Sequence, residues 1–142
     1  MEGRPARVST ERNKTIVRRY IDELNKRNLA ILEELVADDF RDVVLDGYQR
    51  KIASFPDYHV EVDDMIAEGD QVMVEWTHTG THRGEYDGVA PTGKTITGHI
   101  ISVYRVIDGR IVDARGVWDR AEMWEQFDLV DANDPIRDVG AS

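Results

Sequence analysis

The fold is decided by one stretch in the C-terminal third of the chain, ISVYRVIDGRIVDARGVWD, residues 101–119. Two apolar segments flank the dipeptide Asp108-Gly109. This pair is a strong signal for a two-residue hairpin, because both turn positions adopt positive φ. The stretch therefore predicts two long antiparallel strands whose pairing is fixed by the turn.

The register of this hairpin predicts which side chains share a face of the sheet. If Ile107 faces Arg110 across the turn, Ser102 pairs with Arg115 on the neighbouring strand. One face then carries Ile100, Ser102, Tyr104, Asp113, Arg115 and Val117. Polar side chains on a central strand otherwise made of Ile, Val and Tyr indicate a cavity wall rather than dry core. A bulge at Gly116 would exchange the faces of all later residues.

Three segments further upstream alternate apolar and polar residues with the period of two that half-buried strands show. They are HVEVDDMIA (59–67), QVMVEWTHTGTHRG (71–84) and TITGHIISVYRVI (95–107). A turn at 68–70 joins the first two, and the loop YDGVAPTGK (86–94) precedes the third. The second half of the chain is thus a run of long antiparallel strands.

Two helices are expected near the N-terminus. Ser9 or Thr10 can cap the first, and Asn28 can cap the second. Apolar residues recur at helical spacing on one face of each: Ile16, Val17, Tyr20, Ile21 and Leu24, then Leu29, Leu32, Leu35 and Val36. After them, residues 40–45 predict a short strand, 47–54 a short helix and 55–57 a turn.

This order of elements predicts an α+β domain in which helices cover one face of a curved antiparallel sheet. A chain of 142 residues fits a single domain, which we place at residues 1–130. The acidic segment 131–142 is expected to be a loop-like tail.

Composition and charge exclude several classes of function. With 28 acidic and 18 basic residues the formal net charge is -10, which disfavours nucleic acid and anionic membranes as partners. A small neutral or apolar ligand suits this surface better. The chain has no cysteine, no apolar run long enough to cross a membrane and no signal-peptide pattern, so we expect a soluble cytoplasmic protein.

The order of elements and three quoted segments identify a resemblance to a known family. VRRYIDELNKRNLAILEELVADDF (17–40), GVAPTGKTI (88–96) and residues 101–119 resemble the SnoaL-like polyketide cyclases and their ester cyclase-like branch. These belong to the NTF2-like superfamily, which also holds the ketosteroid isomerases, and the match covers about residues 10–127. The resemblance implies an NTF2-like (cystatin-like) cone: a strongly curved antiparallel sheet around a pocket, closed on one side by N-terminal helices. It also implies cofactor-free chemistry and a homodimer formed through the outer sheet face.

The resemblance places two catalytic positions of ring-closing cyclases on residues that cannot replace them. Aligned on the hairpin turn, the family's aspartate falls at Gly116 and its assisting histidine at Ser102. Neither side chain is a competent acid or base at neutral pH. In the isomerases, by the same comparison, Tyr20 matches the tyrosine oxyanion donor and Ser102 the protonated aspartate donor. The isomerase base falls near Val44, between Asp42 and Asp46.

The segment from Phe40 to Phe55 is about ten residues shorter than the resemblance leads one to expect. This segment walls the pocket in the family. We therefore expect a pocket that is more open, or one that is smaller and partly filled by side chains such as Tyr48 and Phe55.

Asp119 is the carboxylate that remains on the last strand. It could act as a general acid or base whose pKa is raised by apolar neighbours such as Trp118. It could also be the N-cap of a helix over 120–127, and Glu122 three residues later gives the capping-box pattern that favours this interpretation.

His99 could pair with Asp119 or donate to a ligand, or it could be a satisfied structural residue opposite Trp118. His78 and His82 lie four residues apart on one side of a strand, but no third ligand accompanies them, so we expect no metal site. A possible ligand-binding surface is formed by the aromatic residues Trp76, Tyr86, Tyr104 and Trp118, which could equally belong to the core or to a dimer interface.

Two functions follow from these patterns. The first is a cofactor-independent cyclase, isomerase or lyase acting by proton transfer on a small apolar carbonyl or polyketide-like molecule. In it Asp119 moves the proton and Tyr20 with Ser102 holds the developing oxyanion. The second is a noncatalytic binding or dimerisation module that has lost the catalytic pair. Both require Tyr20 and Ser102 to project into one hollow.

Overall fold

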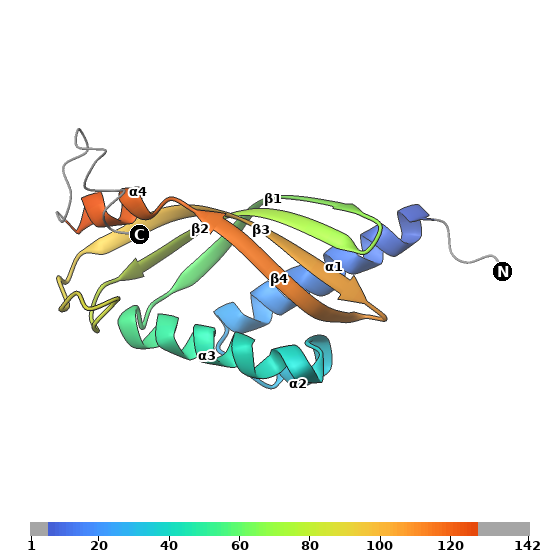
Figure 1. Ribbon diagram of the computed structural model, residues 1–142, viewed down its shortest axis with the longest axis horizontal. Coiled ribbons are helices and arrows are strands. Elements are labelled where there is room, and N and C mark those ends of the chain that lie inside the picture. The colour runs from blue at the N-terminus through green and yellow to red at the C-terminus, as the bar shows by residue number, and fades with distance from the viewer. Residues whose placement is uncertain (1–5, 128–142) are drawn as a thin grey trace.

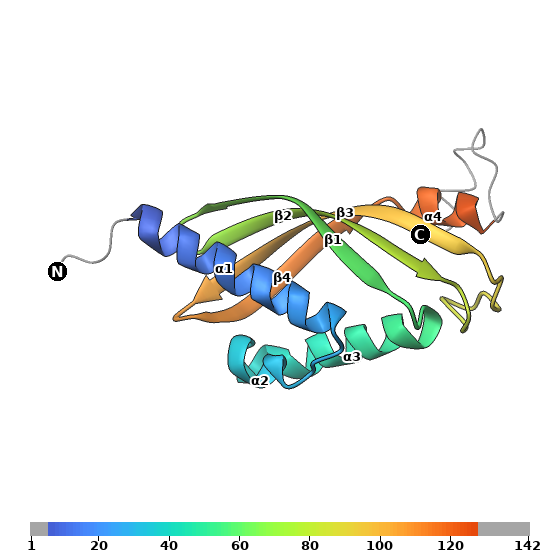
Figure 2. The ribbon, with the colours of Figure 1, turned by 180° about the vertical axis from the view of Figure 1, so that it is seen from behind.

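Four antiparallel strands in the order β1-β2-β3-β4 form an open, curved sheet in the computed structural model, which describes residues 6–127. The elements are α1 (Ala6–Asn25), α2 (Ile31–Leu35), α3 (Asp38–Ser54), β1 (His59–Glu68), β2 (Gln71–Thr81), β3 (Thr95–Ile107), β4 (Arg110–Trp118) and α4 (Arg120–Gln126). The helices α1, α2 and α3 lie together on one side of the sheet, and α4 follows β4 at one end (Figures 1 and 2). The predicted α+β fold is confirmed, while the predicted tail 131–142 lies outside the described residues.

The N-terminal helices begin at different residues from those predicted. Helix α1 starts at Ala6, and Ser9 and Thr10 therefore lie inside it. The helix can extend this far because residues 6–10 contain no Gly or Pro that would end it. Helix α2 has Ala30 rather than Asn28 as its N-cap.

Asn28 cannot cap α2 because it closes α1. Its backbone N–H donates to the Glu23 carbonyl, while the N–H of Arg27 donates to that of Leu24. Arg27 has φ 65°, so the two bonds form the Schellman motif with Arg27 at the left-handed position. The chain therefore turns sharply at Arg27, and this turn fixes where that residue lies.

The strand predicted for residues 40–45 is wrong, because these residues form part of the single helix α3. Asp38 and Asp39 in the first turn favour a helix N-terminus electrostatically. The Arg41 side chain donates to the carbonyls of Leu32 (3.1 Å) and Val36 (2.9 Å), which ties α3 to the end of α2. Helix α3 thus forms a continuous wall opposite the sheet.

The predicted register of the last hairpin is wrong beyond the turn. Ile107 does face Arg110, and Asp108 and Gly109 have φ of 50° and 82° as expected. A bulge at Val112 then shifts the pairing by one residue, and Gly116 is not its position. The observed pairs after the bulge are Tyr104–Ala114, Val103–Arg115, Ser102–Gly116, Ile101–Val117 and Ile100–Trp118. Asp113, Arg115 and Val117 therefore lie on the outer face, and Trp118, which is not opposite His99, lies on the inner face.

Two clusters of buried side chains fill the space between sheet and helices. The first lies under α1 and α2 and includes Tyr20 and Tyr104, and the second lies towards α4 and includes Phe55 and Tyr58. Trp76 is only partly buried and packs against both. The junction of the two clusters lies beside Trp76.

Candidate functional site

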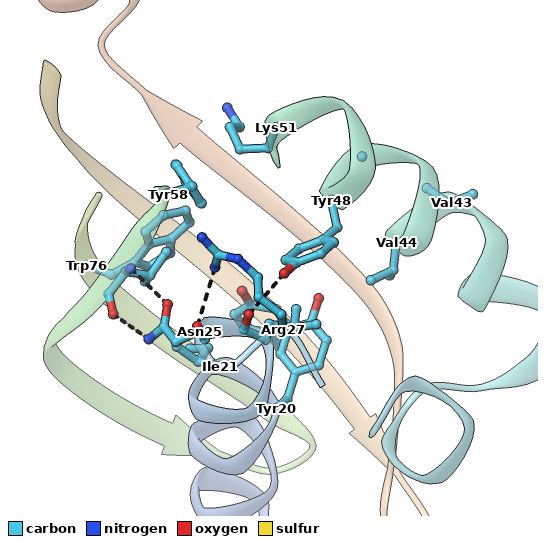
Figure 3. Close-up of a pocket in the computed structure, with 14 residues that line it drawn as sticks. Tyr20, Ile21, Asn25, Arg27, Val43, Val44, Tyr48, Lys51, Tyr58 and Trp76 are labelled. Atoms are coloured by element: carbon cyan, nitrogen blue, oxygen red, sulfur yellow. Dashed lines mark hydrogen bonds between the residues drawn. The ribbon is translucent and has the colours of Figure 1, made fainter. Parts of the chain in front are cut away.

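A pocket of about 260 Å³ lies at the junction of the two clusters, between α1, α3 and the inner face of the sheet (Figure 3). It is lined by Tyr20, Ile21, Leu24, Asn25, Arg27, Val43, Val44, Gly47, Tyr48, Lys51, Tyr58, Val60, Trp76 and Tyr104. Apolar and aromatic side chains dominate this lining, with a few polar groups among them. Such a composition is typical of a site for a small organic molecule.

Tyr20 and Tyr104 supply neutral hydroxyl groups. Their rings meet edge to face, with centroids 5.9 Å apart. Burial raises the pKa of Tyr104 to about 12, although a hydrogen bond with Ser102 acts in the opposite direction. Burial, together with the nearby Tyr104, also raises the pKa of Tyr20. Both phenols therefore stay protonated at physiological pH and can donate to a ligand oxygen.

Ser102 does not line the pocket, although it is buried on the same inner face of the sheet as Tyr104. Its hydroxyl accepts a hydrogen bond of 3.0 Å from Nε1 of Trp76. Ser102 thus holds the indole of Trp76 in place as one wall of the pocket. The expectation that Tyr20 and Ser102 both project into the hollow holds for Tyr20 and fails for Ser102.

Tyr58, which lines the pocket, forms a buried pair with His78, which does not. The Tyr58 hydroxyl lies 2.8 Å from Nδ1 of His78. Burial is the main cause that lowers the pKa of His78 to about 4, and the charge of Lys51 adds to it, so the imidazole is neutral at pH 7. Burial raises the pKa of Tyr58 as well. The pair is a neutral phenol hydrogen-bonded to a neutral imidazole.

Gly98 gives the His78 ring its place against the sheet. Gly98 is the cross-strand partner of His78, and a Cβ at this position would lie 2.2 Å from Nε2 of His78. That nitrogen has no hydrogen-bond partner among residues 6–127. The orientation of His78 towards Tyr58 therefore depends on a glycine in the neighbouring strand.

Lys51, on α3, was not among the predicted site residues. Its ammonium group lies 5.5 Å from the ring centroid of Tyr58, 5.2 Å from that of Tyr86 and 5.8 Å from that of Trp118. Burial lowers the pKa of Lys51, while the charge of Asp87 raises it to a smaller extent. The predicted helix 47–54 already contained Lys51, but a lysine on a helix is usually exposed and no sequence pattern marks this one as a pocket residue.

The structure does not bring the other predicted catalytic residues into the pocket. His99 is exposed on the outer sheet face, where its Nδ1 lies 3.2 Å from Oγ1 of Thr77. Asp119 is exposed and is the N-cap of α4, since its Oδ1 accepts from the backbone N–H of Glu122 at 3.0 Å. The capping interpretation of Asp119 is confirmed. Trp118 does not line the pocket; it lies beside Lys51 and packs against the buried cluster that contains Tyr58.

Other residues considered from the sequence lie on α3 and just after β2. Val44 lines the pocket, whereas Asp42 and Asp46 on either side of it are exposed. His82 is fully buried, and its Nδ1 accepts from the backbone N–H of Thr92 at 3.2 Å. Within residues 6–127 no group of three or more His, Asp or Glu side chains could hold a metal ion.

A curved antiparallel sheet with helices on one side and an apolar, tyrosine-lined pocket between them is the architecture of the NTF2-like fold. The family model for SnoaL-like polyketide cyclase matches residues 14–127. The chain belongs to the SnoaL-like polyketide cyclase family. A comparison with curated proteins found no match.

Solved structures support the same fold. IdmH, a proposed polyketide cyclase from Streptomyces antibioticus, is 28% identical with a TM-score of 0.74, over 82% of this chain and 98% of its own. AclR, a proposed hydroxylase from Streptomyces galilaeus, is 24% identical with a TM-score of 0.76, over 93% and 91%. A proposed SnoaL-like cyclase from Jannaschia sp. CCS1 is 19% identical with a TM-score of 0.79, over 92% and 99%. Among the described residues no helix is long and apolar enough to span a membrane.

Proposed function

We propose that this protein binds a small apolar carbonyl compound and catalyses a proton transfer of the cyclase or isomerase type without a cofactor. The observation that carries the proposal is the 2.8 Å contact between His78 and Tyr58, which lines the same pocket as Tyr20. Membership of the SnoaL-like polyketide cyclase family supports the class of reaction.

In the proposed reaction a carbonyl oxygen accepts a hydrogen bond from Tyr20, with Tyr104 beside it. The Tyr58 oxygen takes a proton from the carbon next to the carbonyl, while the Tyr58 hydroxyl proton passes to Nδ1 of His78. The products are an enolate held by Tyr20 and an imidazolium at His78. The enolate is reprotonated at another carbon, or it adds to a second carbonyl and closes a ring. Preorganised donors in a largely apolar site stabilise the enolate more than water does.

The test is exchange of carbon-bound protons in D₂O, with 2-tetralone as the probe and proton NMR as the measurement. We expect protein-dependent exchange, and a loss of roughly a hundredfold in Tyr58→Phe, the order that one acid–base group contributes. His99→Gln, on the outer face, is the control and should exchange like the unchanged protein. If Asp119→Asn abolishes exchange and Tyr58→Phe does not, the proton is handled by Asp119, as the sequence suggested.

A noncatalytic binding module is the second candidate. It is favoured by the absence of Asp and Glu from the pocket-lining residues within 6–127, and by Gly116 and Ser102 at the family's usual catalytic positions. Under this proposal 2-tetralone raises the melting temperature, as any ligand of the native state must, but its protons exchange no faster than in buffer.

We further propose that the protein is a homodimer formed through the outer face of the sheet. This face exposes Ile66, Met73, Ile101 and Val117, and the sheet register pairs Ile66 with Met73 and Ile101 with Val117. An exposed apolar patch of this kind marks an interaction surface. Light scattering should give twice the chain mass, and Val117→Glu should give the chain mass. If the unchanged protein already has the mass of a single chain, the proposal is refuted.

A further inference from the structure

The pocket carries positive charge in a strongly acidic protein. The chain has 28 acidic and 18 basic residues, yet the described pocket-lining residues include Arg27 and Lys51 and neither Asp nor Glu. In the view of Figure 3 Lys51 lies at the upper end of the pocket and Tyr20 at the lower end, with Tyr58 and the Arg27 guanidinium between them. The distribution of charge in the pocket is therefore opposite to that of the whole chain.

Lys51 differs from the neighbouring basic residues of α3 in what surrounds its charge. Arg41 pairs with Asp38 at 2.8 Å, and Arg50 pairs with Asp46 at 3.1 Å. For Lys51 no ion pair or hydrogen bond is found within residues 6–127, and the ammonium group lies over three aromatic rings instead. Ring faces compensate only part of the cost of removing an ammonium group from water.

Arg27 also keeps its charge without a carboxylate partner among the described residues. Its guanidinium donates to the backbone carbonyls of Pro56 at 2.9 Å and Asn25 at 3.4 Å, both neutral acceptors. The left-handed turn at the end of α1 holds the residue at the pocket. Two cations thus face the same pocket without an ion pair to a carboxylate within residues 6–127: Arg27 is exposed, and the nearby charge of Asp87 offsets the effect of burial on Lys51 only in part.

We propose that the ligand of this pocket is an organic anion: an apolar ring system carrying one ionised oxygen group, a carboxylate or an acidic enol, that binds at Lys51. The inference rests on the proposed function, since it assumes that the pocket binds a small molecule. Arg27 adds a second positive charge to the lining of the pocket. The apolar body of the ligand packs against Trp76, Tyr20 and Tyr104. An anion beside Lys51 also opposes the effect of burial, which by itself lowers the pKa of the lysine.

The experiment compares ligands of equal shape and different charge by calorimetric titration at pH 7. The carboxylate arm is 2-naphthoate against 2-naphthamide. The enol arm is 2-hydroxy-1,4-naphthoquinone against its 2-methoxy ether. In at least one arm the anion should bind about tenfold more tightly or better, the order that a charged hydrogen bond contributes. The arm in which the affinity of the anion exceeds that of its neutral partner by the larger factor identifies the kind of anion.

Two variants link this preference to Lys51. Lys51→Met keeps most of the apolar stem and removes the charge. In this variant the dissociation constants of the anion and its neutral partner should differ by no more than about twofold. Arg50→Met removes a charge from the adjacent exposed residue, which does not line the pocket, and should keep the preference.

Equal binding of anion and neutral partner in both arms would overturn this inference and leave the proposed function intact. A preference that survives in Lys51→Met would overturn it as well. If none of the four compounds binds, and 2-tetralone neither binds nor exchanges, the proposed function fails together with the inference.

Discussion

Gly98→Ala should be among the most destabilising small substitutions in this protein. The added Cβ would lie 2.2 Å from Nε2 and 2.7 Å from Cδ2 of His78, whereas unstrained carbon contacts are about 3.5–4.0 Å. The ring must therefore move by roughly 1 Å or more. It is enclosed by Tyr58 and Trp76, whose ring centroids lie 5.4 Å and 5.8 Å away. It cannot move without losing its hydrogen bond to Tyr58.

The magnitude follows from two separate costs. Overpacking a well-filled site costs about 1–3 kcal/mol. Leaving buried polar groups without their hydrogen bond costs about 1–3 kcal/mol more. Gly98→Ala should therefore lower the free energy of unfolding by roughly 2–6 kcal/mol.

Urea denaturation measures this free energy, and Gly47→Ala is the matched control. No atom lies within 4 Å of a Cβ built at Gly47, which is inside α3, so alanine there should stabilise by about 0.5–1 kcal/mol. His78→Ala removes the ring that clashes, so Gly98→Ala should cost much less in that background. A loss below about 0.5 kcal/mol in Gly98→Ala alone, the range of ordinary surface substitutions, would refute this reasoning.

Three further predictions use the same measurement. Arg27→Gly should be about 1 kcal/mol more stable than Arg27→Ala, because both variants lose the hydrogen bond to Pro56 but only glycine adopts the left-handed φ of 65° without strain, and equal stability of the two would contradict the left-handed assignment. Asp119→Ala should cost about 1 kcal/mol and Asp119→Asn nearly nothing, since asparagine also caps helices; equal costs would show that the cap is not what the carboxylate provides. The folded-state pKa of His78, about 4, lies below its ordinary value of 6.5, so the unfolded chain binds the proton more readily between these values, and stability should fall as pH drops from 6.5 to 4. This group contributes up to about 3 kcal/mol of that fall, and a pH profile unchanged in His78→Phe would argue against it.

The hairpin shows how far sequence reasoning reaches. Asp108-Gly109 predicts the turn and both strands correctly, because the requirement for positive φ is local. The faces of β4 were predicted wrongly because Val112 forms a bulge, and no Gly or Pro in the sequence marks it. One extra residue moved Trp118 to the inner face and Arg115 to the outer face.

The pocket residues could also be predicted from the sequence only in part. Tyr20, Trp76 and Tyr104 were predicted at the pocket and line it, since the apolar periodicity of α1 and the alternation of β2 and β3 place them on inner faces. The N-cap role of Asp119 could also be predicted, because the capping-box pattern is local and ends at Glu122, three residues later. The pair of Tyr58 and His78 depends on contacts between segments distant in sequence, and no local pattern reveals such contacts.

Lys51 was missed for a different reason. The predicted helix 47–54 already placed Lys51 one turn after Tyr48, but a lysine on a helix is usually exposed, and only the packing of α3 against the sheet shows that this face lines the pocket. The strand predicted for residues 40–45 was wrong because the β-branched pair Val43-Val44 resembles a strand, although the acidic start at Asp38 is a helix signal.

The pocket's position at the junction of the two buried clusters links ligand binding to the cooperativity of unfolding. Tyr20 and Tyr104 belong to one cluster and Tyr58 to the other, so a ligand in contact with all three bridges them. Among the described residues, Trp76 and Val60 are the partly buried apolar side chains that pack against both clusters. Amide hydrogen exchange of β2 and β3 should therefore slow at both ends of the strands when the pocket is filled, as expected when two local openings merge into one global transition.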